Sequence, residues 1–101
     1  MSNLLEYQKS YDHTAHKSVI NAMILSPDRG RLVTGSDDCT VIVWATNTGS
    51  MLCHIKTHTP VLSLAWLTNS NGFLLGCKNG MLASVSLNEV RVTEFVESAS
   101  V

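Results

Sequence analysis

Three side chains in the first half of the chain could together perform nucleophilic chemistry. His16, Ser36 and Asp38 offer a base, a hydroxyl nucleophile and an orienting carboxylate, the set that serine hydrolases use. A catalytic serine also needs an oxyanion hole, and the chain has no G-x-S-x-G elbow. A small hydrolase is therefore the least favoured function, and we expect no catalytic residue.

Histidine and cysteine side chains are candidates for a metal site. The set comprises His13, His16, Cys53, His54, His58 and Cys77. Cys53 and His54 are adjacent, so on a strand they point to opposite faces. No spacing in the set matches a zinc pattern, so we expect no metal and no other cofactor. The three cysteines form no C-x-x-C pair, which favours reduced thiols in an intracellular protein.

Short strands separated by turn clusters must position these residues. Apolar or alternating runs predict strands at 19–25, 31–35, 41–44, 51–56, 61–66, 73–75, 81–87 and 91–96, with an extra strand at 4–11. The Lys78-Asn79-Gly80 turn is expected to be a compact hairpin with positive φ at Asn79 and Gly80. No segment keeps a helical period. The predicted class is all-β.

The chain contains an internal repeat. His16 and His58 correspond, because each lies a short distance before an apolar strand. Asp38 and Asn79 correspond in the same way, because each lies in the turn between the second and third strands of its set. A period of about 40 residues with four strands in each unit is the signature of β-propeller blades.

At these residues the chain resembles the WD-repeat family. The resemblance rests on residues 16–19, 25–28 and 32–44, where turn, glycine, acid and tryptophan have the family's spacing. It implies a partial β-propeller of four-stranded antiparallel blades. Residues 16–56 would form one blade, residues 57–101 a degenerate blade, and residues 1–15 the outer strand of a preceding blade.

The resemblance also implies a structural role for the hydrolase-like residues. In WD repeats, similar residues form a hydrogen-bonded tetrad, here His16, Ser36, Asp38 and Trp44. Ala15 and Ala45 depart from the family's glycine and aspartate. Asn79 and Val85 stand where the second repeat would carry its acid and its tryptophan, so we expect this blade to rely on apolar packing.

Composition limits the partners. Charged residues make up 15% of the chain and the net charge is −1, with no run of lysines or arginines, so nucleic-acid binding is not expected. No stretch reaches the roughly 18–20 apolar residues of a membrane helix, and the first residues do not form a signal peptide. These features predict a soluble protein located inside the cell, in the cytoplasm or nucleus.

The expected function is a non-enzymatic scaffold that binds other proteins. By analogy with the family, partners would bind a face made of inter-strand loops, here Lys17, Ser18, Asp37, Cys39, Thr59, Pro60 and Lys78. Two blades cannot close a propeller. The alternatives are therefore a truncated remnant without a ligand and a chain that self-associates to complete a ring. The identity of the partner and the blade number of a longer parent stay open.

Overall fold

The part of the chain that the structure describes contains eight strands. The computed structural model describes residues 15–68, 71–88 and 91–96. The strands are β1 (Ile20–Leu25), β2 (Arg31–Ser36), β3 (Thr40–Ala45), β4 (Met51–Lys56), β5 (Val61–Trp66), β6 (Gly72–Cys77), β7 (Leu82–Ser86) and β8 (Arg91–Val96). The extra strand predicted at 4–11 lies outside the described residues.

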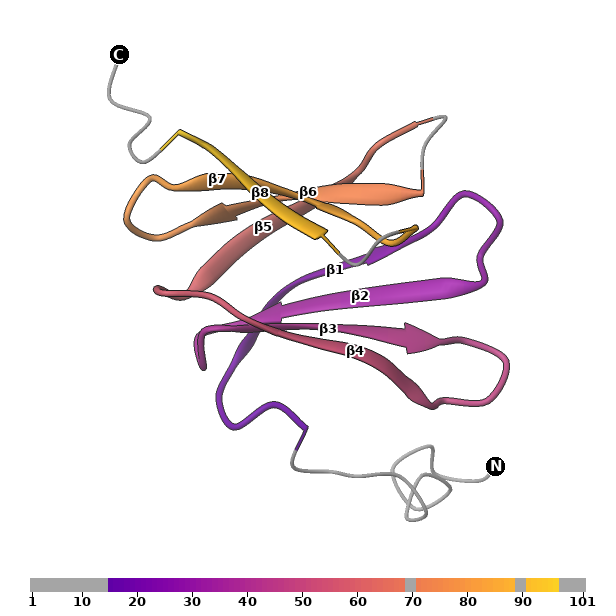
Figure 1. Ribbon diagram of the computed structural model, residues 1–101. Coiled ribbons are helices and arrows are strands. Elements are labelled where there is room, and N and C mark those ends of the chain that lie inside the picture. The colour runs from indigo at the N-terminus through magenta and orange to yellow at the C-terminus, as the bar shows by residue number, and fades with distance from the viewer. Residues whose placement is uncertain (1–14, 69–70, 89–90, 97–101) are drawn as a thin grey trace.

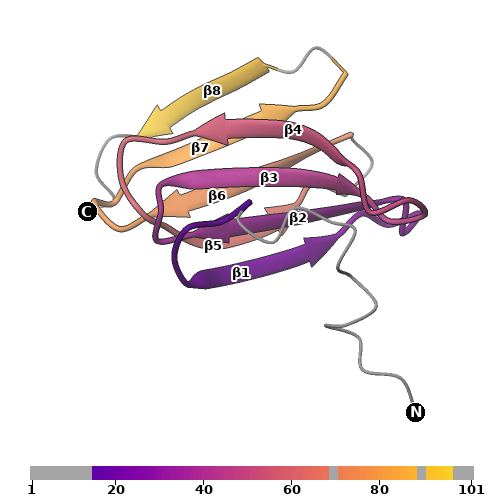
Figure 2. The same cartoon turned by 90° about the horizontal axis from the view of Figure 1, so that it is seen from below.

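The strands form two antiparallel sheets of four. The first sheet has the order β1-β2-β3-β4 and the second the order β5-β6-β7-β8, so each strand pairs with its neighbour in sequence. Figure 1 shows the sheets as two layers, and Figure 2, from below, shows the first sheet in front of the second. The fold is all-β with four-stranded blades of the β-propeller type, as the turn and strand pattern predicts.

The two sheets repeat each other down to their irregularities. A register shift lies between Ile20 and Ala22 in β1, and another between Val61 and Ser63 in β5. The hairpin turns that follow β2 and β6 also match, because each closes on a residue with positive φ.

The turn after β6 differs from its prediction at one residue. Gly80 has a φ of 89°, but Asn79 is not among the residues with positive φ. The Gly80 N–H donates to the Cys77 carbonyl at 2.9 Å, so Lys78 and Asn79 occupy the centre of an ordinary turn and Gly80 alone takes the left-handed conformation. Cys39, with a φ of 66°, takes the same place after β2.

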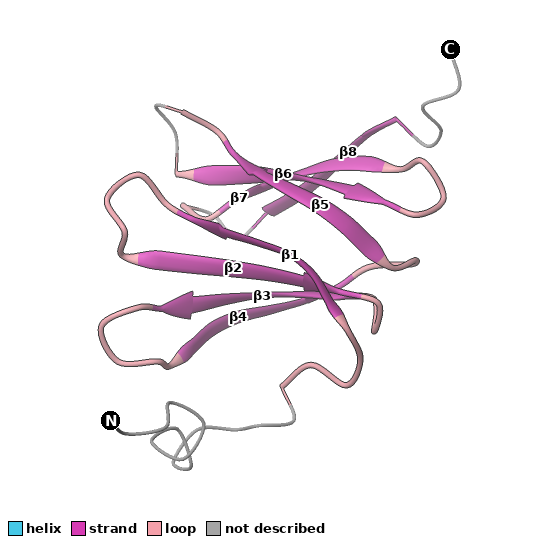
Figure 3. Ribbon diagram, turned by 180° about the vertical axis from the view of Figure 1, so that it is seen from behind, coloured by secondary structure: helices cyan, strands magenta, loops and turns pink. Residues whose placement is uncertain are grey.

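The core lies between the sheets. Val33, Val41 and Val43 of the first sheet are at most 1% exposed. They cluster with residues of the second sheet, among them Val61, Phe73, Leu75, Ala83 and Val85. Figure 3 shows β1 and β5 side by side where the sheets meet. Burial of these apolar side chains supplies the main free energy that joins the layers.

Glycine sets how closely the layers approach. A Cβ built on Gly35 would lie 2.6 Å from Val61 Cγ1, closer than real carbon atoms pack. Any side chain at residue 35 would therefore push the second sheet away. Trp66 packs against the same core, with its ring centroid 6.0 Å from that of Phe73.

Candidate functional site

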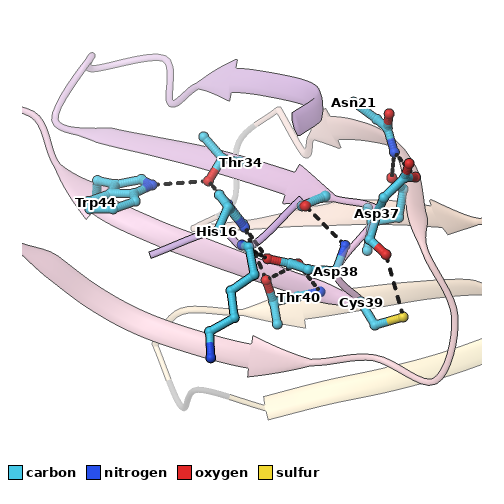
Figure 4. A network of polar contacts seen from close by, with 11 residues as sticks. His16, Asn21, Thr34, Asp37, Asp38, Cys39, Thr40 and Trp44 are labelled. Atoms are coloured by element: carbon cyan, nitrogen blue, oxygen red, sulfur yellow. Dashed lines mark hydrogen bonds and ion pairs between the residues drawn. The ribbon is translucent and has the colours of Figure 1, made fainter. Parts of the chain in front are cut away.

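A hydrogen-bonded network links the segment before β1 to β2 and β3. His16 Nδ1 lies 3.2 Å from Asp38 Oδ2, and His16 Nε2 lies 2.6 Å from Thr34 Oγ1. The Trp44 indole N–H donates to the same Thr34 oxygen at 3.0 Å. Figure 4 shows these side chains as one chain of contacts from Trp44 to Asp38. The network ties three separate segments together.

The donors in this network indicate one tautomer of His16. Thr34 Oγ1 accepts from the indole, so its own O–H is free to donate to His16 Nε2. The Nδ1–H then donates toward Asp38 Oδ2 and toward Thr40 Oγ1, which is 3.1 Å away. The Thr40 hydroxyl in turn donates to Asp38 Oδ1. With this tautomer every polar atom of the network has a partner.

Asp38 is held in its ionised form. Burial of the carboxylate opposes ionisation, but hydrogen bonds from the Thr40 hydroxyl, the Lys17 N–H and His16 outweigh it. Together they lower the pKa of Asp38 to about 2. The Lys17 N–H donates to Oδ2 at 2.8 Å and the Thr40 N–H to Oδ1 at 3.0 Å, so the carboxylate also orders the backbone on both sides of it.

The structure corrects one member of the predicted tetrad. Thr34, not Ser36, provides the hydroxyl between His16 and Trp44. Both side chains are on the same face of β2, but Ser36 lies two residues, about 6.6 Å, further along the strand. Trp44 pairs with Leu32, so its indole is next to Thr34 and out of reach of Ser36. Ser36 Oγ instead accepts the Asp38 N–H at 3.0 Å.

The geometry of these groups does not suit hydrolysis. The His16 side chain is 5% exposed, and both of its ring nitrogens are used within the network. Ser36 is fully buried, and its hydroxyl contacts the Asp38 backbone. A substrate carbonyl could therefore reach neither group without opening the sheet.

The second sheet lacks this network. By the repeat that relates Asp38 to Asn79, Leu75 replaces Thr34 and Val85 replaces Trp44, and both are buried at 1% exposure in the inter-sheet core. Asn79 Oδ1 accepts the Met81 N–H at 2.9 Å, which is the equivalent of the bond from the Thr40 N–H to Asp38 in the first sheet. Apolar packing therefore occupies the positions that the polar network holds in the first sheet.

The seven residues predicted to bind partners gather at one end of the two sheets. We call this end the loop face: Lys17, Ser18, Asp37, Cys39, Thr59, Pro60 and Lys78. Equivalent backbone hydrogen bonds hold its loops in place. The Asp37 N–H donates to the Val19 carbonyl and the Lys78 N–H donates to the Pro60 carbonyl, each at 2.9 Å. The side chains of Lys17, Ser18, Asp37 and Lys78 are exposed, whereas Cys39, Thr59 and Pro60 are half-buried.

Asn21 joins the two sheets beneath the loop face. Its side-chain amide donates to Asp37 Oδ1 at 2.7 Å and to the Val61 carbonyl at 2.9 Å (Figure 4). Sequence reasoning missed this residue because Asn21 lies inside an otherwise apolar run, and its partners are 16 and 40 residues away. Asn21 lies at the register shift of β1, between Ile20 and Ala22.

Other kinds of site find no support in the described part of the chain. Within residues 15–68, 71–88 and 91–96, no group of three histidine, cysteine or acidic side chains could hold a metal ion. In these ranges Cys39, Cys53 and Cys77 are not joined by disulfides. In the same ranges no helix is long and apolar enough to span a membrane.

The comparisons with known proteins agree with the fold. Residues 7–45 match the WD40 family (WD domain, G-beta repeat). The chain is 37% identical over 68 residues to the ribosome biogenesis protein BOP1 homolog of Anopheles gambiae, which covers 67% of this chain and 8% of that protein. It is 33% identical over 61 residues to the ribosome biogenesis protein bop1-A of Xenopus laevis, covering 60% of this chain and 8% of the relative. The chain thus spans less than a tenth of these curated relatives.

Solved structures share the arrangement of the strands. The WD40 repeats of RRP9 superpose with a TM-score of 0.76 at 18% identity, covering 83% of this chain and 28% of that one, which shows the fold alone. The computationally designed Ika4 protein superposes with a TM-score of 0.67 at 27% identity, covering 76% of this chain and 46% of that one. Two four-stranded blades, one with a His-Thr-Asp-Trp network, define a propeller-repeat protein. Residues 7–45 carry a WD40 repeat, and the described strands that follow share its four-stranded blade.

Proposed function

We propose that the chain is a non-enzymatic scaffold that binds a protein partner through the loop face. The proposal rests on the backbone hydrogen bonds that hold the loops of this face in place. Equivalent backbone hydrogen bonds fasten Asp37 to Val19 and Lys78 to Pro60, and the Thr57 N–H donates to the Cys39 carbonyl at 2.8 Å. A surface ordered in advance binds at a lower entropic cost than one that must be ordered on binding.

The chemistry of the loop face suits a partner with mixed polarity. Lys17 and Lys78 are exposed cations at one end of the molecule, and the exposed carboxylate of Asp37 lies between the two blades. Interfaces of this kind combine a few charged contacts with small polar and apolar ones. The hydrogen bonds inside the tetrad would then stabilise the first blade and leave the loop residues free for recognition.

The relatives suggest where such a partner is found. Their names refer to ribosome biogenesis, and we propose that this chain acts in the nucleus in the same process. Because ribosomes contain RNA, the expectation that the chain binds no nucleic acid stays a prediction. Binding of a fluorescent single-stranded RNA to the purified chain tests it, and saturable binding would overturn it. The blade bounds 16–56 and 57–101 likewise stay proposals.

A photo-cross-linking residue placed at Lys78, with a control at Asn47 in the opposite turn, tests the loop face. Both side chains are exposed. We expect cross-links to a discrete protein from Lys78 and none from Asn47. The purified partner should then bind the Lys17→Glu, Lys78→Glu double variant about tenfold more weakly, a loss of about 1.4 kcal/mol. Equal cross-linking from both positions would overturn the assignment.

His16→Ala separates the scaffold from the hydrolase alternative. A structural role predicts a lower melting temperature, since the Thr34 hydroxyl and the Asp38 carboxylate lose a buried partner. A catalytic role predicts an unchanged melting temperature and lost turnover of a chromogenic ester. That second outcome would contradict the non-enzymatic proposal.

A further inference from the structure

A cavity lies between the two sheets, at the opposite end of the strands from the loop face. Its volume is about 570 Å³, and it is found where the turn between β1 and β2 comes near the end of β5 (Figures 1 and 3). Cavities of roughly 300–1,000 Å³ are large enough for a small ligand or for a few side chains of a peptide. Both sheets contribute to its walls, the first with Pro27, Asp28 and Arg31 and the second with Trp66, Thr68 and Asn71.

The apolar part of the wall is held in place before any ligand arrives. Trp66 is half-buried, because it packs on the core between the sheets, and its ring centroid lies 6.0 Å from that of Phe73. Pro27 adds an exposed ring from the turn of the first sheet. An apolar side chain in the cavity would contact these rings, and a ring that is already fixed loses little conformational entropy on binding.

The carboxylate of Asp28 is used inside its own turn. Asp28 Oδ1 accepts the Ser26 hydroxyl at 2.6 Å and the Gly30 N–H at 2.8 Å. These two hydrogen bonds, with a smaller contribution from the charge of Arg31, lower the pKa of Asp28. Asp28 therefore shapes the turn from which Arg31 begins β2.

The guanidinium group of Arg31 has donors left for another molecule. The side chain is exposed, and the single side-chain hydrogen bond that it makes among the described residues runs from Nη1 to the Gly30 carbonyl at 3.5 Å. It forms no salt bridge within those residues. A guanidinium group carries five N–H donors in a planar fork that matches the two oxygens of a carboxylate. Arg31 is therefore the charged group of the cavity that is best placed to bind a ligand.

We propose that this cavity binds an acidic segment of a partner protein, with a carboxylate on Arg31 and a neighbouring apolar side chain against Trp66. A basic segment is disfavoured, because its cation would have to share the hydrogen-bonded Asp28 carboxylate with Arg31 and would be repelled by Arg31. A nucleic acid is disfavoured as well, since one cation beside a carboxylate attracts a chain of phosphates weakly. The inference does not depend on the loop face, because the two sites lie at opposite ends of the strands.

Fluorine NMR of the full chain labelled with fluorotryptophan tests the proposal. The chain has two tryptophans, Trp44 in the tetrad and Trp66 in the cavity, and Trp66→Phe assigns their signals. The probe is the capped tripeptide Glu-Phe-Glu, with Gln-Phe-Gln and Lys-Phe-Lys as matched peptides. We expect Glu-Phe-Glu to shift the Trp66 signal saturably and to leave the Trp44 signal unchanged. Each matched peptide should bind about tenfold more weakly.

Two arginines of the same turn provide a matched pair of variants. Arg31→Gln should weaken the binding of Glu-Phe-Glu about tenfold, because it removes the charged fork. Arg29 is also exposed but does not line the cavity, so Arg29→Gln should bind like the wild type. Circular dichroism checks that both variants fold. If Arg31→Gln does not fold, then Thr68→Glu replaces it, since a negative charge on that wall should repel the same peptide.

Four results would overturn the proposal. The first is a Trp66 signal that Glu-Phe-Glu does not shift at millimolar concentration, and the second is equal binding of Gln-Phe-Gln. The third is tighter binding of Lys-Phe-Lys, which would assign the cavity to basic segments. The fourth is wild-type affinity in a folded Arg31→Gln variant, or in Thr68→Glu where that variant takes its place.

Discussion

Thr34 is the residue at which the polar network of the first blade converges. Its single hydroxyl contacts both the Trp44 indole and His16, and the residue itself is 4% exposed. A buried donor that loses its partner costs more than the hydrogen bond itself contributes, because water cannot replace the partner. The network therefore depends more on Thr34 than on Ser36, which caps a single backbone N–H.

Thr34→Val should lower the free energy of unfolding by about 2–3 kcal/mol, since it leaves the indole N–H and a ring nitrogen of His16 without a partner. Ser36→Ala is the matched control and should cost about 1 kcal/mol. Urea unfolding followed by the fluorescence of Trp44, in a Trp66→Phe background, measures both. A larger loss for Ser36→Ala would mean that the serine is the tetrad hydroxyl after all.

Asp38 should make the first blade sensitive to acid. Its pKa is about 2 when folded, below the ordinary value of 3.8, so the carboxylate stabilises the fold fully above pH 3.8. That contribution is lost as the pH falls from about 4 through 2, because the unfolded chain binds the proton more readily. Unfolding free energies measured between pH 7 and pH 2 should fall more steeply for the wild type than for Asp38→Asn. Parallel curves would contradict the assigned hydrogen bonds.

At the scale of the elements, the hairpin turns after β2 and β6 each contain one left-handed residue. Gly80 takes this conformation after β6 without strain, but Cys39 takes it after β2 with a φ of 66°. A side chain in that region costs free energy that glycine does not pay. The first blade thus has a well-bonded network next to a strained turn.

Cys39→Gly should raise the free energy of unfolding by about 0.5–1 kcal/mol, because it relieves the left-handed strain. The weak contact that it removes, Cys39 Sγ to the Asp37 carbonyl at 3.9 Å, is too long to offset the gain. The reciprocal change, Gly80→Cys, should destabilise the second hairpin by a similar amount. Thermal unfolding measures the melting temperature of both variants. If both melt below the wild type, then the Cys39 thiol stabilises the fold by more than its left-handed backbone costs.

At the scale of the whole molecule, stability depends on how the two layers fit. The layers approach closely where Gly35 admits Val61, and a polar bridge joins them where Asn21 reaches the Val61 carbonyl. Both features lie next to the β1 and β5 strands that meet between the sheets (Figure 3).

Gly35→Ala should destabilise the chain by about 1–3 kcal/mol, since the added Cβ would lie 2.6 Å from Val61 Cγ1 and would force the layers apart. Gly30→Ala is the control, because its Cβ would meet only the Asp28 side chain, at 3.3 Å. Urea unfolding of the full chain measures the difference. An unchanged urea midpoint for Gly35→Ala would contradict the close approach of the two sheets at Gly35 and Val61.

Most of the fold follows from local features of the sequence. Alternating apolar runs and turn clusters define strands between positions 19 and 96, and the internal repeat groups them into two sets of four. The resemblance to WD repeats likewise assigns His16, Asp38 and Trp44 to one network. These features can be read from the sequence because strand faces alternate and turn residues act locally.

Contacts between distant segments could be known only from the folded chain. Thr34, and not the predicted Ser36, supplies the hydroxyl of the network. The register of β2 against β3 decides which hydroxyl lies beside the indole. Asn21 became a bridge because β5 packs over β1, far away in sequence. Local residue types constrain each strand, but the pairing register and the packing of one layer on another depend on the whole set of side chains at once.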